Sequence, residues 1–342
     1  MTARRLILHV GPHKTGSTAL QHALLNTRDA LAEQGFDYPL TGIQQFAHHQ
    51  LYGVFAGEAR AVAELPVAKL LTDLDHGRDV ILSSENFIYL GERRLAELRD
   101  HLAGFRVEVV IFIRSPVELW PSHWQELVKH GRAETLIEYM AAYLGWNSVI
   151  DASIMNPVVQ GNRFGRVFGR EALRMFSYDN IVDNDEDIYD MFWRSVLRIE
   201  APPPARERRV LNPSLEPVMT EMLRCLNEQH LQSGARPSDF VLSRYLKVLA
   251  EVEASPEYAE FREAFEGSAA TLHLESAQEL FRNRERMLMN SFGACIENKA
   301  AGDRLNTREV FKRNFVYARR YWADRAGLAG WVGRVLARLG EI

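Results

Sequence analysis

The sequence predicts an α/β fold, a parallel sheet flanked by helices, followed by a helical C-terminal part. Short apolar segments that read as buried strands recur through the first 200 residues, with helical segments between them. Such alternation is typical of parallel sheets that are covered on both faces. Polar or charged residues follow the strands directly. Because ligands of such sheets bind beyond the carboxyl ends of the strands, these residues are the first candidates for a site.

The size and charge of the chain limit its functions. It has 342 residues, 46% of them hydrophobic, and 41 Lys and Arg against 45 Asp and Glu give a net charge of −4. This balance excludes a general affinity for nucleic acid or anionic lipid, so a polyanionic ligand needs a local cluster of positive charge. The two cysteines, Cys225 and Cys295, predict neither a disulfide framework nor a cysteine zinc site, which fits a reducing compartment.

The amino terminus leads directly into the first predicted strand, and no long apolar run follows anywhere in the chain. We therefore expect neither a cleaved signal peptide nor a transmembrane helix. The expected location is the cytoplasm.

The predicted elements begin with a buried strand, Leu6–Val10, and a helix from Ser17 to Gln34 that ends at Gly35. A loop or short helix is expected within Gln44–Phe55. The later predicted strands are Phe36–Tyr38, Asp79–Ser83, Val107–Ile113 and Leu173–Ser177. The later predicted helices are Ala59–Asp75, Glu92–Leu102, Val117–His130 and Ile188–Leu197.

The segment Ala201–Ala205 (APPPA) predicts a stiff connector. The sequence after it reads as helical, over Ser214–Gln232, Asp239–Ala254, Glu257–Phe265 and Ala270–Met289. We therefore predict a core over residues 1–200 and a helical extension, packed on the core or capping it, over residues 201–342.

Gly11–Thr18 (GPHKTGST) joins the first strand to a helix and has the composition of a phosphate-binding turn. Gly11 and Gly16 allow a tight turn and a close approach of the backbone to a ligand. Backbone N–H groups at a helix N-terminus attract anions, and Lys14 adds a full positive charge. Hydroxyl donors are available from Thr15, Ser17 and Thr18.

This turn is not a Walker A motif, because Lys14 precedes Gly16 and Ser17 stands where the Walker lysine would be. A generic turn with a capping serine or threonine is the structural alternative.

A second anion site is predicted at the end of the strand VEVVIFI, where Arg114 follows directly. Nucleoside-triphosphate enzymes usually place an aspartate at such a strand end to hold Mg²⁺. An arginine binds anions instead, often through two hydrogen bonds. Ser122, in the first turns of the next predicted helix, can donate to the same anion. An ion pair with a surface carboxylate is the alternative.

The octet Gly11–Thr18, placed after an apolar strand and before Ala-Leu-Gln, resembles the 5'-phosphosulfate loop of the sulfotransferases that use 3'-phosphoadenosine 5'-phosphosulfate (PAPS). It looks closest to bacterial members of that family, and the resemblance covers roughly residues 4–200. It implies a P-loop-like core and that Lys14 contacts the 5'-phosphosulfate. It further implies that the phosphate is wrapped by Thr15, Gly16, Ser17 and Thr18.

Arg-Ser-Pro with a serine eight residues after the arginine is similar to the family's 3'-phosphate motif, which implies that Arg114 and Ser122 hold that phosphate. Tyr178, followed by Asp179, resembles the family's Tyr-Glu-Asp segment, whose tyrosine lies near the adenine. Asp179 departs from the usual glutamate, and a core tyrosine at a strand end is the alternative for Tyr178. The polar residues Arg209 and Asn212 close over the nucleotide or belong to a plain helix start at Ser214.

The base that removes the acceptor's proton is expected to be a histidine or a glutamate. Glu85 is the first candidate, because it follows the strand DVILS at the active edge; an N-cap or surface acid is its alternative. His48 and His49 are rivals, and since adjacent side chains point in different directions, at most one of them faces an acceptor. His13 is expected to orient the backbone of the turn.

Sulfuryl transfer depends mainly on positioning and electrostatics, and we expect no metal, because the sequence has no cluster with metal-ligand spacing. The expected acceptor is a hydroxyl or amine, with a carbohydrate or glycan as first choice. Aromatic residues form a cleft for it or belong to the core: Trp120, Trp124, Tyr139, Tyr143 and Trp146.

The stretch Leu305–Ile342 is rich in lysine and arginine and contains two tryptophans. It predicts either a solvated helix packed on the protein or a basic helix in peripheral contact with a membrane. Two other functions stay open for the chain, a P-loop kinase acting on a small molecule and a non-catalytic nucleotide-binding protein.

Overall fold

The computed structural model describes residues 3–58, 77–145, 156–203, 214–232, 253–268, 270–273, 278–299 and 314–317. The chain divides into two units. The first takes Met1–Pro116, Val149–Asn212 and Leu280–Arg308, and the second takes Val117–Ser148, Pro213–Glu279 and Glu309–Ile342. The boundary near residue 200 between core and extension stays a prediction.

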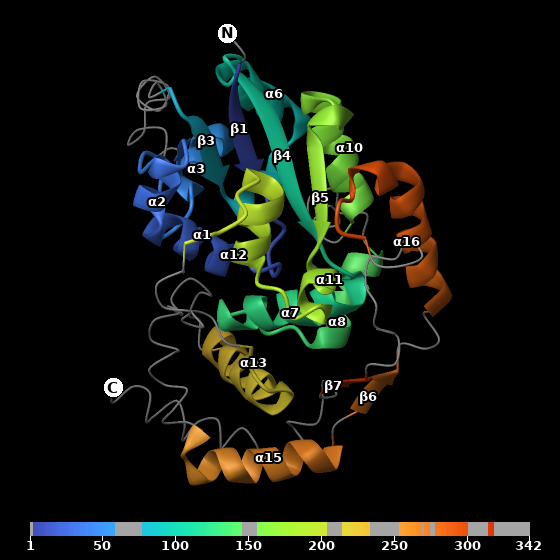
Figure 1. The fold of residues 1–342 in the computed structure, drawn as a ribbon. Helices are drawn as coiled ribbons and strands as arrows, with labels where there is room; N and C mark the ends of the chain where they lie inside the picture. Colours follow the sequence, from blue (N-terminus) through green and yellow to red (C-terminus); the bar gives the residue numbers. More distant parts are fainter. Residues whose placement is uncertain are drawn as a thin grey trace. The chain divides into compact units, whose positions relative to one another are not determined.

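A parallel sheet of five strands, in the order β2-β3-β1-β4-β5, forms the centre of the first unit. β1 lies in the middle and pairs with β3 on one side and β4 on the other. Figure 1 shows β4 and β5 pointing the same way. The strands are β1 (Arg4–His9), β2 (Phe36–Asp37), β3 (Asp79–Ser83), β4 (Phe105–Ile113) and β5 (Leu173–Ser177). The predicted fold class, a parallel sheet flanked by helices, is confirmed.

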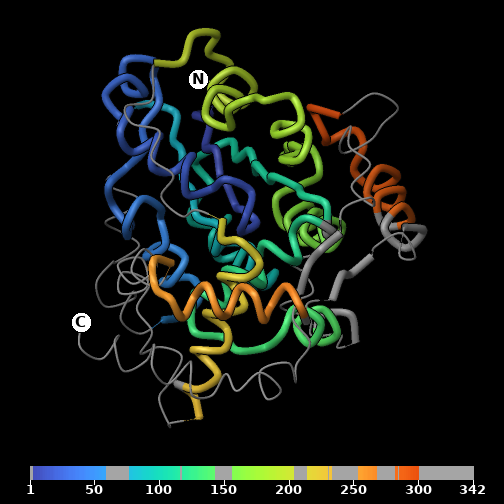
Figure 2. The backbone as a smooth tube through the Cα atoms, turned by 90° about the horizontal axis from the view of Figure 1, so that it is seen from below, coloured from blue at the N-terminus to red at the C-terminus, as the bar shows by residue number. Residues whose placement is uncertain are grey.

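Helices cover both faces of this sheet, as the view along the strands in Figure 2 shows. Alternate residues of β1 point to opposite faces. Leu6 and Leu8 pack with Phe164 in one buried cluster, whereas Ile7 packs with Leu20 in the other. The helices of this unit are α1 (Ser17–Asn26), α2 (Arg28–Glu33), α3 (His49–Ala56), α6 (Glu92–His101), α10 (Pro157–Phe168), α11 (Tyr178–Asp183), α12 (Ile188–Met191), which continues as a π-helix over Phe192–Leu197, and α16 (Gln278–Phe292).

The predicted helix Ser17–Gln34 is two helices, α1 and α2, which meet at Thr27. The Thr27 hydroxyl donates to the Ala23 carbonyl at 2.8 Å, and such a bond competes with regular helix geometry. The helix predicted over Ala59–Asp75 lies outside the described residues, and that over Asp239–Ala254 almost wholly does.

The second unit contains α7 (Pro116–Lys129), α8 (Leu136–Gly145), α13 (Pro217–Gln232) and α15 (Pro256–Ser268). Polar groups on α13 are buried but paired: Arg224 bonds Glu221 at 2.7 Å and the Ala133 carbonyl at 2.9 Å. The prediction of one helix over Ala270–Met289 is wrong at its start. Ala270–His273 form strand β6, which pairs antiparallel with β7 (Asn314–Tyr317).

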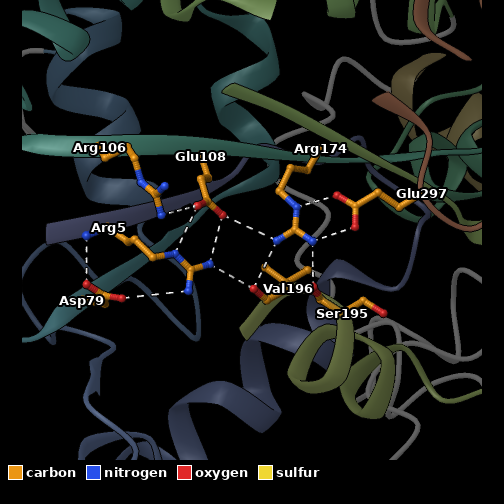
Figure 3. A network of polar contacts seen from close by, with 8 residues as sticks. All are labelled: Arg5, Asp79, Arg106, Glu108, Arg174, Ser195, Val196 and Glu297. Carbon is orange, nitrogen blue, oxygen red and sulfur yellow. Dashed lines mark hydrogen bonds and ion pairs between the residues drawn. The ribbon is translucent and has the colours of Figure 1, made fainter. Parts of the chain in front are cut away.

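An ion-pair network ties the amino-terminal parts of the strands together (Figure 3). The Glu108 carboxylate accepts from the Arg5 guanidinium at 3.1 and 3.0 Å and from Arg106 at 3.1 Å. Arg174 lies 3.5 Å from the same carboxylate and also bonds Glu297. Three strands thus meet at one carboxylate, at the end of the sheet opposite to the predicted site.

Replacing Glu108 with glutamine is expected to lower the free energy of unfolding by about 2 kcal/mol, because it removes the negative charge that three arginines share. Asp79 stays beside Arg5 and Glu297 stays beside Arg174, which limits the loss. Burial raises the pKa of Glu108. Hydrogen bonding from Arg5 and the charges of the three arginines lower it by more than burial raises it, so the net shift is downward. The contribution of Glu108 is therefore present above its unfolded pKa and is lost as the pH falls through the lower folded pKa.

Urea unfolding at several pH values measures the free energy of unfolding of the Glu108→Gln variant and of the parent protein. Glu97→Gln is the control, since that glutamate pairs with arginines on the exposed surface of α6 and its loss should change stability little. A Glu108→Gln protein as stable as its parent at neutral pH would contradict the stabilising role of Glu108 in this network.

Candidate functional site

Four strand ends carry the polar residues that the sequence singled out. Gly11 follows β1 closely, Glu85 follows β3, Arg114 follows β4 and Tyr178 follows β5. Because β3, β1, β4 and β5 are successive neighbours in a parallel sheet, their carboxyl ends lie at one edge. All four residues belong to the first unit.

The two glycines of the turn lie against other strand ends and leave no room for a side chain. Gly11 has φ +92°, and a Cβ there would lie 2.9 Å from Glu85 Cα. Gly16 has φ +77°, and a Cβ there would lie 2.9 Å from Tyr178 Cε2. Left-handed backbone of this kind favours glycine. The turn therefore passes between Glu85 on one side and Tyr178 on the other.

The turn is braced from inside by its own hydroxyl groups. Thr15, which is fully buried, donates to the Pro12 carbonyl at 2.7 Å, and Ser17 donates to the same oxygen at 3.4 Å. Thr18 is exposed in the first turn of α1, and Gly16 is the N-cap of that helix. The turn thus ends at the positive end of a helix dipole, where anions are stabilised.

Arg114 extends from β4 to the turn. Its Nη1 donates to the Lys14 carbonyl at 2.7 Å, and its Nε lies 3.5 Å from Asp179 Oδ1. The guanidinium lies over the Tyr178 ring, 5.3 Å from its centre. Asp179 also accepts from the Ser115 N–H, which fixes its carboxylate. The Arg114 guanidinium is thereby held against the backbone of the turn at Lys14.

Asp179 is part of this arrangement, although its place in the sequence indicates only a departure from a motif. It is buried and orients Arg114 from the β5 side. A carboxylate directly after a strand end was the available signal. Burial raises the pKa of the neighbouring Tyr178 hydroxyl, so this side chain is neutral at neutral pH.

Glu85 lies largely buried on the other side of the turn. Its Oε2 accepts from Gln21 Nε2 at 2.7 Å, and its Oε1 lies 3.9 Å from His49 Nε2. Burial raises the pKa of Glu85. The charges of His13 and His49 and the hydrogen bond from Gln21 together lower it by more than burial raises it. The net shift is downward, so Glu85 is a carboxylate at neutral pH.

The adjacent histidines have different surroundings. His48 is fully buried; its Nδ1 accepts from the Ser83 N–H at 3.1 Å and its Nε2 donates to the Pro39 carbonyl at 3.0 Å. Burial lowers the pKa of His48 to about 4. His49 instead places Nδ1 2.9 Å from Ser84 Oγ and Nε2 toward Glu85. His48 is therefore engaged with backbone, and His49 is the histidine beside the carboxylate.

His13 lies in the turn with its ring 5.6 Å from that of Tyr89. Ser122 lies on α7 in the second unit, so its pairing with Arg114 stays a prediction. Arg209, Asn212 and most of Leu305–Ile342 lie outside the described residues. Three of the aromatic candidates are buried: Trp120, Trp124 and Tyr139. The side chains of Tyr143 and Trp146 are outside the described part.

Within the described ranges, no group of three or more His, Cys, Asp or Glu side chains is arranged to hold a metal ion. In the same part of the chain, no helix has the length and apolar character to cross a bilayer.

No protein-family model matches the sequence, and no curated protein is significantly similar to it. Among solved structures, the chain is similar to the crystal structure of a sulfotransferase from Alicyclobacillus acidocaldarius. The identity is 14%, the match covers 85% of this chain and 97% of that chain, and the TM-score is 0.42. A likeness at this level supports no inference about activity.

Proposed function

We propose that this protein is a sulfotransferase that moves the sulfuryl group of PAPS to a hydroxyl or amine acceptor, with a carbohydrate or glycan as the acceptor class. The observation that carries the proposal is the contact between Arg114 and the turn: its guanidinium bonds the Lys14 carbonyl at 2.7 Å. A donor with phosphates at both ends of one adenosine requires positive charge at two adjacent places, and this contact supports that arrangement.

In the proposed complex the 5'-phosphosulfate occupies the turn and the N-terminus of α1. Its partners there are the backbone and side chains of the turn: Gly11, His13, Lys14, Thr15, Gly16, Ser17 and Thr18. The 3'-phosphate binds Arg114 and Ser122, and the adenine lies near Tyr178. Arg209 and Asn212 are proposed to close over the nucleotide.

The chemical step needs a base beside the sulfur. We assign that role to Glu85, which is ionised and has one oxygen toward His49. The acceptor oxygen or nitrogen forms a bond to sulfur while the bond from sulfur to the 5'-phosphate oxygen breaks. The acceptor's proton passes to Glu85, and Lys14 stabilises the charge on the departing phosphate. The products are the sulfated acceptor and 3'-phosphoadenosine 5'-phosphate (PAP).

His49 is a supporting residue in this scheme, because its imidazole faces the carboxylate and tunes its basicity. His48 is left out, because both of its ring nitrogens bond backbone groups. We propose a cytoplasmic location, with membrane contact through the basic stretch Leu305–Ile342 if the acceptor is linked to a lipid.

Incubation with radiolabelled PAPS and a panel of glycans, lipids and phenols tests the proposal. Transfer of label to one class supports it and identifies the acceptor class. PAP that fails to bind, together with tight binding of ATP and Mg²⁺, would contradict the proposal.

Replacing Arg114 with alanine is expected to weaken PAP binding by about 10- to 100-fold, because a charge-assisted hydrogen bond to phosphate is lost. Binding of adenosine 5'-phosphosulfate, which lacks the 3'-phosphate, should weaken less, since it loses only the support that Arg114 gives the turn through the Lys14 carbonyl. Calorimetry with both nucleotides measures the difference, and Arg106→Ala, at the opposite end of β4, is the control. Equal losses for the two nucleotides would exclude Arg114 as a 3'-phosphate ligand.

A further inference from the structure

A buried polar chain lies behind Glu85 and begins at Gln21 on α1. The Gln21 side chain is only 2% exposed. Its Nε2 donates to Glu85 Oε2 at 2.7 Å and to Ser83 Oγ at 3.1 Å. Both hydrogens of this amide group are thus used, one of them on the carboxylate. A buried polar side chain with two such bonds has a fixed orientation.

The Glu85 carboxylate sets the orientation of the Gln21 amide. An ionised carboxylate only accepts hydrogen bonds, so the nitrogen side of the amide faces Glu85. At the far end of the chain, His9 Nδ1 lies 2.7 Å from Ser83 Oγ, and burial lowers the pKa of His9 to about 4. In either tautomer of neutral His9, Ser83 Oγ keeps a lone pair that accepts from Gln21.

Gln21 also links the carboxylate to the phosphate turn. It lies one helical turn after Ser17, on the same face of α1, and α1 begins directly after Gly16. Gly11 of the same turn lies against the backbone and Cβ of Glu85. Through Gln21, the carboxylate is therefore linked to the segment that is proposed to bind the donor.

We propose that Gln21 is a positioning residue, which holds Oε2 of Glu85 so that Oε1, beside His49, faces the acceptor. This inference rests on the proposed function, since it gives Gln21 a role through the base. The titratable groups that influence Glu85 come from β1, the turn, the segment after β2 and α3: His9, His13, Tyr38 and His49. Gln21 supplies a donor to Oε2 at 2.7 Å.

The near-isosteric variant Gln21→Met removes this donor and keeps the side chain's volume. We expect kcat for sulfuryl transfer to fall about 10-fold, as for the loss of a hydrogen bond to a charged group. The acid limb of the pH profile of kcat/KM should move to higher pH, because the ionised form of Glu85 loses a stabilising donor. PAP binding should stay within about twofold of the parent, since a change of that size is below one hydrogen bond.

Two further measurements separate this role from a structural one. A ¹³C NMR titration of the glutamate carboxyls, with the Glu85 signal assigned through Glu85→Gln, reports the pKa of Glu85 directly and needs no activity. Thr27→Val, which removes another buried side-chain bond at the end of α1, is the matched control. It should lower stability without moving the Glu85 titration or the pH profile.

An unchanged Glu85 titration in Gln21→Met would overturn the inference, even if the parent protein transfers sulfate. A shifted titration with an unshifted pH profile would also overturn it, because Gln21 would then not act through the base. If the parent binds no PAP, the proposed function fails by that separate measurement. A shift in both, with PAP binding retained, supports the inference.

Discussion

Replacing Lys14 with alanine is expected to reduce kcat by about 10³-fold, the loss typical of removing a group that stabilises charge in the transition state. Lys14 lies in the turn with φ 64°, and the Arg114 guanidinium bonds its carbonyl, which fixes the backbone of Lys14. The expected role of its ammonium is to stabilise the charge that forms on the departing 5'-phosphate. Initial rates with saturating PAPS measure the effect.

The loss at Lys14 should appear in kcat more than in the binding of PAP, because the charge it opposes grows as the bond to sulfur breaks. Lys14→Arg keeps the charge and should retain part of the rate, whereas Lys14→Met keeps only the length and should match the alanine variant. A Lys14→Ala protein with parental kcat would exclude Lys14 from the chemical step.

Replacing Glu85 with glutamine is the second large effect, with an expected loss of about 10²- to 10⁴-fold in kcat, the range for a general base. The glutamine side chain has the same shape, so the close approach of Gly11 is preserved. The acid limb of the pH profile should disappear, because the group that loses its proton there is gone. PAP binding should be unchanged, which calorimetry checks.

The histidine variants complete this test. His49→Gln is expected to lower kcat less than Glu85→Gln does, because His49 is proposed to act through the carboxylate, from which its Nε2 lies 3.9 Å. His48→Gln is expected to lower stability, since both ring nitrogens bond backbone. If His49→Gln were the most damaging of the three, the base would be His49.

Much of the first unit could be predicted because its strands are buried on both faces and therefore read as continuous apolar runs. Leu173–Ser177 and Asp79–Ser83 have the predicted bounds. The strand ends could be predicted too, since a charged residue directly after such a run must lie at the edge of the sheet. Elements that depend on distant partners could not be predicted. β6 forms only by pairing with β7, about forty residues further along the chain.

The candidate site likewise has features that the sequence predicts and features that only tertiary contacts decide. Spacing indicates that Gly11, Lys14 and Arg114 follow neighbouring strand ends, but it does not reveal which side chains meet. In the sequence, Gln21 looks like an ordinary helix residue, and only the structure shows its contact with Glu85. Its position four residues after Ser17 indicates only that it lies on the same face of the helix as the turn residue Ser17. The difference between His48 and His49 is likewise set by tertiary contacts, with Ser83 and Pro39 in one case and Ser84 in the other.

Calorimetric titration of the parent protein with PAP, compared with adenosine 5'-phosphate, tests most directly whether Lys14 and Arg114 hold the two phosphorylated ends of one adenosine. We expect PAP to bind at one site per chain and adenosine 5'-phosphate to bind about 10- to 100-fold more weakly, because it lacks the group proposed to contact Arg114. The absence of heat with PAP, or equal affinity for the two nucleotides, would contradict the proposal.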